Sequence, residues 1–482
     1  MRAHSSYHAS SSSIRPEYDD LILNIINYVY DTPVLNSKLA VETAKYCLLD
    51  SIGCALLALN SPACTKLLGP LVPESSMPNG SRVLGTDFEL DPIEAAFNNG
   101  ALIRWLDFND TWVAAEWGHP SDNLGAILAC LDYLHRSKNI KIHKKIMIQA
   151  LIEAMIKAHE VQGVLALNNS FNKVGLDHVL LVRIASTAVS SWLLGATKEQ
   201  ACAALSQAWI DGSALRTYRH APNAGPRKSW AAGDASARAV RLSLLNLKGG
   251  MGCPSALTAK RWGFQAVCFE GKEVSLERAL SSYVMENILF KISYPAEFHA
   301  QTAVEAAIQL HPKIINKLDQ VKNIEIETTE AAIRILDKTG PLNNPADRDH
   351  CLQYMVAIAL LYGNLSADHY EDYLAVDLKI DALRTLMLVR ENREFTQNYL
   401  DPEKRAIGNA ITIIYKDGSR SERICIEYPL GHRARRQEAL PLLMEKARKN
   451  ISSRYDHERT EKLMDLFTNP NFLFQPIDCL FE

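Results

Sequence analysis

Apolar residues recur at helical spacing through most of the first 280 or so positions. Four stretches keep an apolar face with a period of about 3.6 residues, as amphipathic helices do. They are Ser37–Leu59, Ile146–Glu160, His178–Leu194 and the Ala-rich Lys198–Trp209. This pattern predicts a large helical domain.

The pattern changes in the second half of the chain. Val321–Thr329 alternates in steps of two, and Ala410–Tyr428 consists of two alternating runs around Asp417-Gly418, which is a strong β-hairpin signal. After Gly431 the helical period returns in PLLMEKARKNIS. The sequence therefore predicts a mainly α protein with a helical domain at 1–286, an inserted smaller α+β lid domain at 287–428, and a C-terminal return to the helical domain at 429–482.

Composition places the chain among ordinary globular proteins. The 482 residues are 47% hydrophobic and 22% charged, with a formal net charge of −3, so nothing indicates bulk affinity for nucleic acid. No apolar run approaches the roughly eighteen residues that a membrane-spanning helix needs. The Ser-rich residues 1–15 are expected to form a disordered tail. Their composition also resembles a mitochondrial transit peptide, but the segment is short and lacks an amphipathic Arg pattern.

Ten cysteines are scattered through apolar surroundings, and none forms a CxxC pair. Such spacing is typical of reduced, buried cysteines in a cytosolic protein and disfavours disulfides, a zinc site and an iron–sulfur cluster. We therefore expect no metal and no cofactor.

The stretch WLDFNDTWVAAEWGHPSDN, from Trp105 to Asn123, mixes four acids and a His with three Trp residues. If Arg104–Thr111 is helical, Asp107 and Thr111 share one face. The following Gly-His-Pro turn fixes His119, and the next helix has N-cap candidates in Ser121, Asp122 and Asn123. A His beside a carboxylate and a hydroxyl, walled by aromatic rings, suits proton transfer. The alternative is a capped helix junction with a satisfied core His.

Basic residues gather in RTYRHAPNAGPRKSWAAGD. They are Arg216, Arg219, His220, Arg227 and Lys228. A flexible loop with this composition suits the binding of carboxylates or phosphates. The alternative is a solvated basic loop, and nucleic-acid binding is disfavoured because the basic residues are confined to this loop.

A third polar group lies where the chain enters the predicted inserted domain. FKISYPAEFHAQTAVEAA carries Lys291, Tyr294, Glu297 and His299. A passage between domains is a common place for a cleft, although a plain connecting segment fits the spacing as well.

Several stretches spread over nearly the whole chain resemble the 2-methylcitrate dehydratase family, which also contains cis-aconitate decarboxylase and iminodisuccinate epimerase. They are YCLLDSIGCALLAL, IRWLDFNDTWVAAEWGHPSDNLGAILA, KAHEVQG, NSFNKVGLDHVLL, ALRTYRHAPNAGPRKSWAAGDA, SYVMENILFKISYPAEFHAQTAVEAA and GPLNNPADRDHCLQYMVAI. The first fifteen and last twenty-five residues agree least.

The resemblance implies an active site between a helical domain and an α+β lid. It carries the family's catalytic residues onto Asp107, Thr111, His119, His178 and Lys228. The basic loop, with Lys291, Glu297 and His299, is then expected to bind substrate. The decarboxylase branch has a His at the position of Glu297, so the lid-side acid or base is either Glu297 or His299.

The implied reaction is the metal-independent elimination of water from 2-methylcitrate to give 2-methyl-cis-aconitate, in the methylcitrate cycle of propionate degradation. Citrate and cis-aconitate are further candidate substrates. The alternatives are decarboxylation of cis-aconitate, epimerisation of a dicarboxylate, or a non-catalytic helical binding protein. We expect a homodimer in the cytoplasm, or in mitochondria if the source is eukaryotic, with no nucleic-acid or membrane partner.

Overall fold

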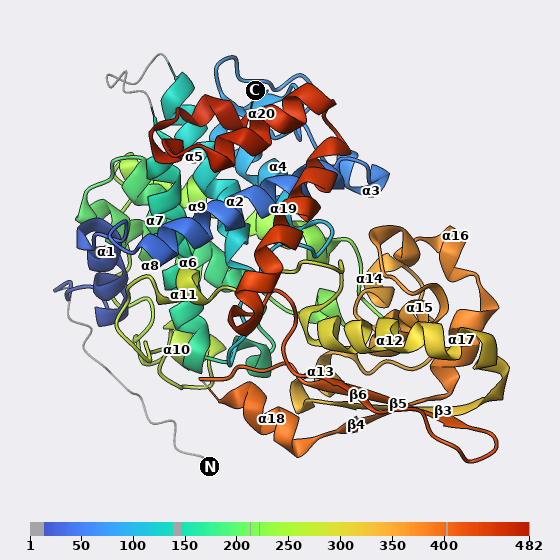
Figure 1. The fold of residues 1–482 in the computed structure, drawn as a ribbon. Coiled ribbons are helices and arrows are strands. Elements are labelled where there is room, and N and C mark those ends of the chain that lie inside the picture. The colour runs from blue at the N-terminus through green and yellow to red at the C-terminus, as the bar shows by residue number, and fades with distance from the viewer. Residues whose placement is uncertain (1–13, 138–145, 213, 221, 402, 482) are drawn as a thin grey trace, which may run out of the picture.

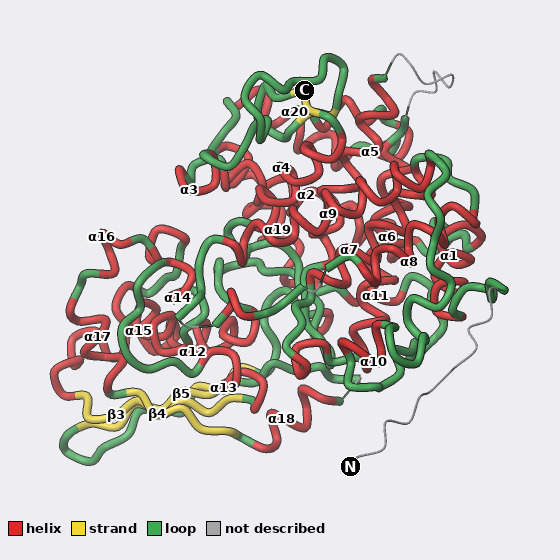
Figure 2. Tube along the Cα trace, turned by 180° about the vertical axis from the view of Figure 1, so that it is seen from behind, coloured by secondary structure: helices red, strands yellow, loops and turns green. Residues whose placement is uncertain are grey.

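The computed structural model describes residues 14–137, 146–212, 214–220, 222–401 and 403–481. The chain is mainly α-helical with two small sheets, as the sequence predicts (Figures 1 and 2). Most of the expected N-terminal tail lies outside the described residues. Within the described residues, no helix has the length and apolar character needed to cross a bilayer.

Eleven helices precede residue 288 within the described ranges, and two more close the chain. The first eleven are α1 (Asp20–Asp31), α2 (Lys38–Ala58), α3 (Pro62–Thr65), α4 (Pro92–Arg104), α5 (Leu124–Arg136), α6 (Ile148–Asn168), α7 (Val179–Leu193), α8 (Lys198–Ile210), α9 (Arg227–Leu247), α10 (Phe264–Cys268) and α11 (Tyr283–Asn287). The last two are α19 (Arg436–Ser452) and α20 (His457–Thr468). Helices α2, α6, α7 and α8 confirm the four predicted helical stretches.

A short antiparallel pair, β1 (Ser81–Arg82) and β2 (Glu89–Leu90), interrupts the helical part. Each strand has two residues, which is too short to produce an alternating pattern in the sequence.

The residues between 294 and 428 hold the second sheet and its covering helices. The helices are α12 (Gln301–Ile314), α13 (Glu330–Leu336), α14 (Pro345–Arg348), α15 (Leu352–Tyr362), α16 (Asp372–Ala375), α17 (Leu378–Thr385) and α18 (Arg393–Leu400). The strands are β3 (Val321–Thr328), β4 (Met387–Glu391), β5 (Asn409–Tyr415) and β6 (Ile424–Ile426), in the order β4-β3-β5-β6. Only β3 and β4 pair in parallel, and β5 and β6 form the predicted hairpin.

The two parts have separate hydrophobic cores. One core draws on residues 21–292 and 439–480, and the other on residues 296–424. The C-terminal helix α19 packs on α2. A small third cluster combines residues of both parts of the chain, among them Val113, Phe298 and Tyr399.

Three glycines allow α4, α5 and α9 to pack closely against one another. A Cβ atom on Gly100 of α4 would lie 2.7 Å from the Cα atom of Gly233 in α9. A Cβ atom on Gly125 of α5 would lie 2.9 Å from the Cα atom of Gly100. Because no side chain fits at these crossings, α4, α5 and α9 pack backbone to backbone.

The predicted helix across Arg104–Thr111 is wrong. Helix α4 ends at Arg104, and Asp107 adopts the left-handed region with φ 51°. The backbone N–H of Thr111 then donates to the carbonyl of Leu289 at 2.8 Å, in an isolated antiparallel bridge. Tertiary pairing with the 288–291 segment replaces the local helical pattern.

Of the predicted N-cap candidates, Asn123 occupies the N-cap position of α5, but its side chain makes no capping hydrogen bond. Residues Pro120–Asn123 form a 3-10 turn before the helix. The candidate cap side chains are used elsewhere. Ser121 Oγ accepts from Asn109 Nδ2 at 2.8 Å, and Asn123 Nδ2 donates to Gln162 Oε1 at 2.6 Å.

Candidate active site

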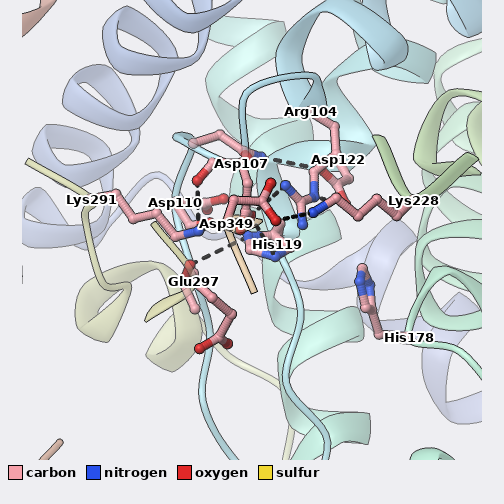
Figure 3. A network of polar contacts seen from close by, with 12 residues as sticks. Arg104, Asp107, Asp110, His119, Asp122, His178, Lys228, Lys291, Glu297 and Asp349 are labelled. Carbon is pink, nitrogen blue, oxygen red and sulfur yellow. Dashed lines mark hydrogen bonds and ion pairs between the residues drawn. The ribbon is translucent and has the colours of Figure 1, made fainter. Parts of the chain in front are cut away.

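A buried carboxylate with two cationic neighbours lies at the centre of the site (Figure 3). Asp107 Oδ1 forms an ion pair with Arg104 NH1, and Lys291 Nζ lies 2.8 Å from the same oxygen. Lys291 Nζ also donates to the Asp107 carbonyl at 2.7 Å. A left-handed Asp is uncommon, and here it turns both its carboxylate and its carbonyl toward Lys291.

The two cations determine the charge of this carboxylate. Burial alone would raise the pKa of Asp107, but Arg104 and Lys291 hold it well below its ordinary value. Burial in turn lowers the pKa of Lys291, against the opposing effect of Asp107. Asp107 is therefore a fixed anion at neutral pH rather than a proton acceptor.

His119 has a defined tautomer. Its Nδ1 lies 2.7 Å from the carbonyl oxygen of Asp110, which can only accept, so Nδ1 carries the proton. The other ring nitrogen, Nε2, then presents a lone pair 3.6 Å from Asp107 Oδ1. Burial, reinforced by Arg104 and Lys291, lowers the pKa of His119 well below its usual value. The ring is neutral at pH 7 and can accept a proton at Nε2.

Thr111 lies beside the same ring. Its Oγ1 is 3.3 Å from His119 Nδ1, and the side chain is buried. The structure thus brings Asp107, Thr111 and His119 together, although through a turn rather than along a helix face.

The second predicted His lies across from the first. The rings of His119 and His178 have centroids 5.5 Å apart, and His178 Nδ1 is buried without a hydrogen-bond partner. His178 precedes α7 and follows Asp177, whose Oδ1 lies 3.8 Å from its Nε2. Burial lowers the pKa of His178 well below its ordinary value.

The predicted basic loop divides into buried and exposed members. Arg219 binds Asp177 in a bidentate ion pair, and Arg216 NH1 lies 3.7 Å from the same carboxylate. In contrast, His220 and Arg227 are exposed. The Arg227 guanidinium stacks over the Trp230 ring at 4.4 Å. His220 and Arg227 therefore lie outside the buried cluster.

Lys228, at the start of α9, contacts the second part of the chain. Its ammonium pairs with Asp349 and donates to the Ala346 carbonyl at 3.2 Å. His350 Nδ1 is 3.1 Å from Lys228 Nζ and 2.7 Å from Asp349 Oδ1. Burial lowers the pKa of Lys228, and Asp349 opposes that effect.

Glu297 and His299 form a separate contact at the start of α12. His299 Nδ1 lies 2.9 Å from Glu297 Oε1, and its Nε2 lies 3.1 Å from the Tyr399 hydroxyl. The His299 ring also meets the edge of Trp117. In Figure 3 the Glu297 side chain lies apart from the Asp107 carboxylate.

Several site residues were not identified from the sequence. Arg104 pairs with Asp107, and its Nε lies 4.0 Å from Asp122, a buried carboxyl whose pKa burial raises to about 7. Asp349 and His350 come from PADRDHC, which lies more than a hundred residues beyond Lys228. The density of charged residues in PADRDHC was the one available signal.

A second buried cluster contains metal-ligand types. Among the described residues, ligand atoms of Cys47, Asp110 and His159 all lie within 4.8 Å of one another. Hydrogen bonds also account for the cluster, because His159 Nε2 at 3.0 Å and Cys47 Sγ at 3.5 Å both lie within donating distance of Asp110 Oδ2. Ser121 N–H donates to the same carboxylate at 3.1 Å. The three side chains are the candidate ligands if this region holds a metal.

Comparisons with known proteins cover nearly the whole chain. The MmgE/PrpD N-terminal domain matches residues 24–277, and the MmgE/PrpD C-terminal domain matches residues 294–469. The 2-methylcitrate dehydratase of Escherichia coli strain K12 is 56% identical over 461 residues, which cover 95% of this chain and 95% of that protein. The 2-methylcitrate dehydratase of Cupriavidus necator is 55% identical over 456 residues, which cover 94% of each chain.

A eukaryotic relative is almost as similar. The protein of Yarrowia lipolytica named "2-methylcitrate dehydratase, mitochondrial" is 53% identical over 458 residues, which cover 94% of this chain and 88% of that protein. Both family domains are present in order. The chain therefore belongs to the MmgE/PrpD family.

Proposed function

We propose that this protein eliminates water from 2-methylcitrate to give 2-methyl-cis-aconitate. The observation that carries the proposal is the identity of 53–56% with proteins named 2-methylcitrate dehydratase, over 94–95% of this chain, in both bacteria and a yeast. The buried, cation-rich site supplies the group types that such an elimination needs. The methylcitrate cycle of propionate degradation is the proposed context.

His119 is the proposed general base. Its Nε2 takes the proton from the methyl-bearing carbon adjacent to the carbon that holds the tertiary hydroxyl, and the electron pair released forms the new double bond as the C–O bond breaks. Asp107 is not assigned this role, because Arg104 and Lys291 hold its pKa well below its ordinary value and so make the carboxylate a weak base. It orients Lys291 and stabilises the imidazolium that forms.

Lys228 is the proposed proton donor to the departing hydroxide, which leaves as water. His178 is neutral because burial lowers its pKa well below its usual value, whereas Asp349 supports the charged form of Lys228. His178 Nδ1 has no partner in the described structure, so we assign it a hydrogen bond to the substrate. Removing a proton next to an ionised carboxylate builds up negative charge, which the nearby cations stabilise.

The carboxylate clamps are Arg216 and Lys291, with Thr111 on the hydroxyl side. Arg219 instead orients Arg216 by holding Asp177 between them. The exposure of His220 and Arg227 removes them from the proposed set. Glu297 and His299 remain the lid-side candidates. Because Glu297 binds His299 and His299 contacts the Tyr399 hydroxyl, we propose that the pair lines the site wall and does not touch the reacting atoms.

Residues 287–428 are proposed to act as a lid over this site. The separate core of that segment, and the few residues in the cluster at the junction, support movement relative to the helical part. Lys228 on α9 pairs with Asp349 of this segment, and we propose that the substrate hydroxyl displaces Asp349 from the ammonium.

The reaction is proposed to need no metal or iron–sulfur cluster, because the proposed acid, base and cations account for each step and the sequence contains no CxxC pair. A homodimer remains a prediction, which light scattering would test. A cytoplasmic location, or a mitochondrial one in a eukaryote, also remains a proposal, and one relative is named mitochondrial.

The test is an absorbance assay for the conjugated alkene with 2-methylcitrate, citrate and cis-aconitate as separate substrates. The proposal expects an increase with 2-methylcitrate. Release of carbon dioxide from cis-aconitate without an increase from 2-methylcitrate would assign the chain to the decarboxylase activity instead.

A further inference from the structure

Lys446, on the C-terminal helix α19, points its ammonium into the interior behind the candidate site. The side chain is 5% exposed. Its Nζ donates to the carbonyl of Phe108 at 2.7 Å and to the carbonyl of Lys291 at 2.5 Å. It also lies 2.7 Å from Asp50 Oδ1 on α2 and 3.6 Å from the centre of the Phe108 ring.

The ammonium makes two kinds of contact. It donates hydrogen bonds to the two carbonyls, and it forms an ion pair with the Asp50 carboxylate. Asp50 is 1% exposed, so it compensates the buried charge. Compensation of the Lys446 charge by Asp50 does not explain why the ammonium also binds two backbone carbonyls.

Both carbonyls belong to the backbone that carries the central ion pair. Phe108 follows Asp107, whose left-handed conformation turns the chain toward Lys291. The Lys291 ammonium reaches the carboxylate and the carbonyl of Asp107 at 2.8 and 2.7 Å. A single ammonium on α19 therefore joins two segments that lie more than 180 residues apart in the chain.

We propose that Lys446 is a positioning residue for catalysis, which keeps Asp107 and Lys291 in contact by holding the carbonyls of Phe108 and Lys291. The inference rests on the proposed function, because it gives the contact of Asp107 with Lys291 a role in turnover. Lys446 itself does not touch the reacting atoms.

Paired variants separate positioning from charge compensation. Lys446→Met removes the ammonium and leaves Asp50 as an unpaired buried carboxylate, so stability and turnover both fall. Asp50→Asn/Lys446→Met removes both charges and restores stability, but the carbonyls of Phe108 and Lys291 still lack their hydrogen-bond donor. Asp50→Asn alone keeps the ammonium on the carbonyls at a cost in stability. Lys449→Met, at an exposed position on the same helix, is the matched control.

The expected kinetic result is a loss of kcat of about 10- to 100-fold in the double variant. KM should change less, because Lys291 moves but the other carboxylate clamp, Arg216, stays in place. Asp50→Asn should keep kcat per folded molecule within about twofold of the unmodified protein. A double variant with near-normal kcat, or an Asp50→Asn variant that loses as much kcat as Lys446→Met, would overturn the proposal.

A second measurement does not depend on turnover. Lys291 is one of the cations that depress the pKa of His119, after burial and Arg104. If the double variant lets Lys291 withdraw from Asp107, the pKa of His119 rises, and NMR titration of labelled histidine detects the shift. An unchanged His119 titration contradicts positioning by Lys446. If the unmodified protein fails to dehydrate 2-methylcitrate, the proposed function fails, while this titration still decides the role of Lys446.

Discussion

The imidazole Nδ1 of His119 lies 2.7 Å from the backbone carbonyl oxygen of Asp110, and this contact leaves Nε2 as the basic nitrogen of the ring. The carboxylate of Asp110 accepts from the N–H of Ser121, two residues beyond His119, at 3.1 Å. Asp110 thus fixes both the orientation of the ring and the loop that carries it. The predictions below follow from a base whose tautomer is set by the fold.

Replacing His119 with Gln removes the base but keeps a polar side chain of similar reach. We expect kcat to fall by about 10²–10⁴-fold, the usual contribution of a general base, with little change in the melting temperature. His457→Gln, at an exposed position, is the control and should retain full activity. Near-normal turnover in His119→Gln would move the base to another residue.

The pH dependence of stability follows from two depressed histidine pKa values. Burial lowers the pKa of His119 and of His178 well below their ordinary value, so the unfolded chain binds more protons than the folded protein just below about pH 6.5. The free energy of unfolding should therefore decrease as the pH falls through that value. Denaturant titrations between pH 8 and 5 measure this, and replacement of both histidines by Gln should remove their part of the pH dependence.

Asp107→Asn should affect both activity and stability. The left-handed conformation tolerates Asn, but Arg104 and Lys291 would lose the carboxylate that compensates them. We expect a loss of about 3–5 kcal/mol in the free energy of unfolding and of most turnover per folded molecule. Asp87→Asn, on the surface, should change neither. Full stability with normal turnover would show that this ion pair is dispensable.

Lys228→Ala tests the proposed proton donor. A charge-assisted hydrogen bond contributes about 1.5–3 kcal/mol, so we expect kcat/KM to fall by at least about tenfold. Lys248→Ala, at an exposed position, is the matched control. A lowered melting temperature with unchanged kcat/KM would reduce the role of Lys228 to its contact with Asp349.

Chelation and elemental analysis test whether the protein needs a metal. We expect activity to survive EDTA and exposure to air, with less than one equivalent of zinc or iron per chain. One bound metal that is lost together with activity, and also lost in Cys47→Ser, would assign it to the cluster of Cys47, Asp110 and His159.

The sequence predicted the regular elements better than the site geometry. Helices such as α2 and strands such as β3 were predicted because each carries its own periodic pattern. Asp107 and His119 were identified, but the helix proposed between Arg104 and Thr111 was not found, since the pairing of Thr111 with Leu289 overrides the local pattern. A contact of this kind, between distant segments, leaves no periodic signal.

The same reason explains the missed residues. Asp349 contacts Lys228, which lies 121 residues earlier in the chain. Lys446 contacts Phe108, which lies 338 residues earlier. The basic loop shows the opposite error, because its five cations look alike in the sequence. Only the fold separates the buried Arg216, Arg219 and Lys228 from the exposed pair.

His119 Nε2 is proposed to remove the proton that starts the elimination, and deuterium exchange reports on this step. The unmodified protein, incubated with 2-methylcitrate in deuterated water, should form 2-methyl-cis-aconitate and incorporate deuterium at the substrate carbon that is deprotonated. His119→Gln, folded and able to bind 2-methylcitrate, should do neither. Normal exchange in His119→Gln would assign the base to another residue, and no alkene from the unmodified protein would exclude the dehydration.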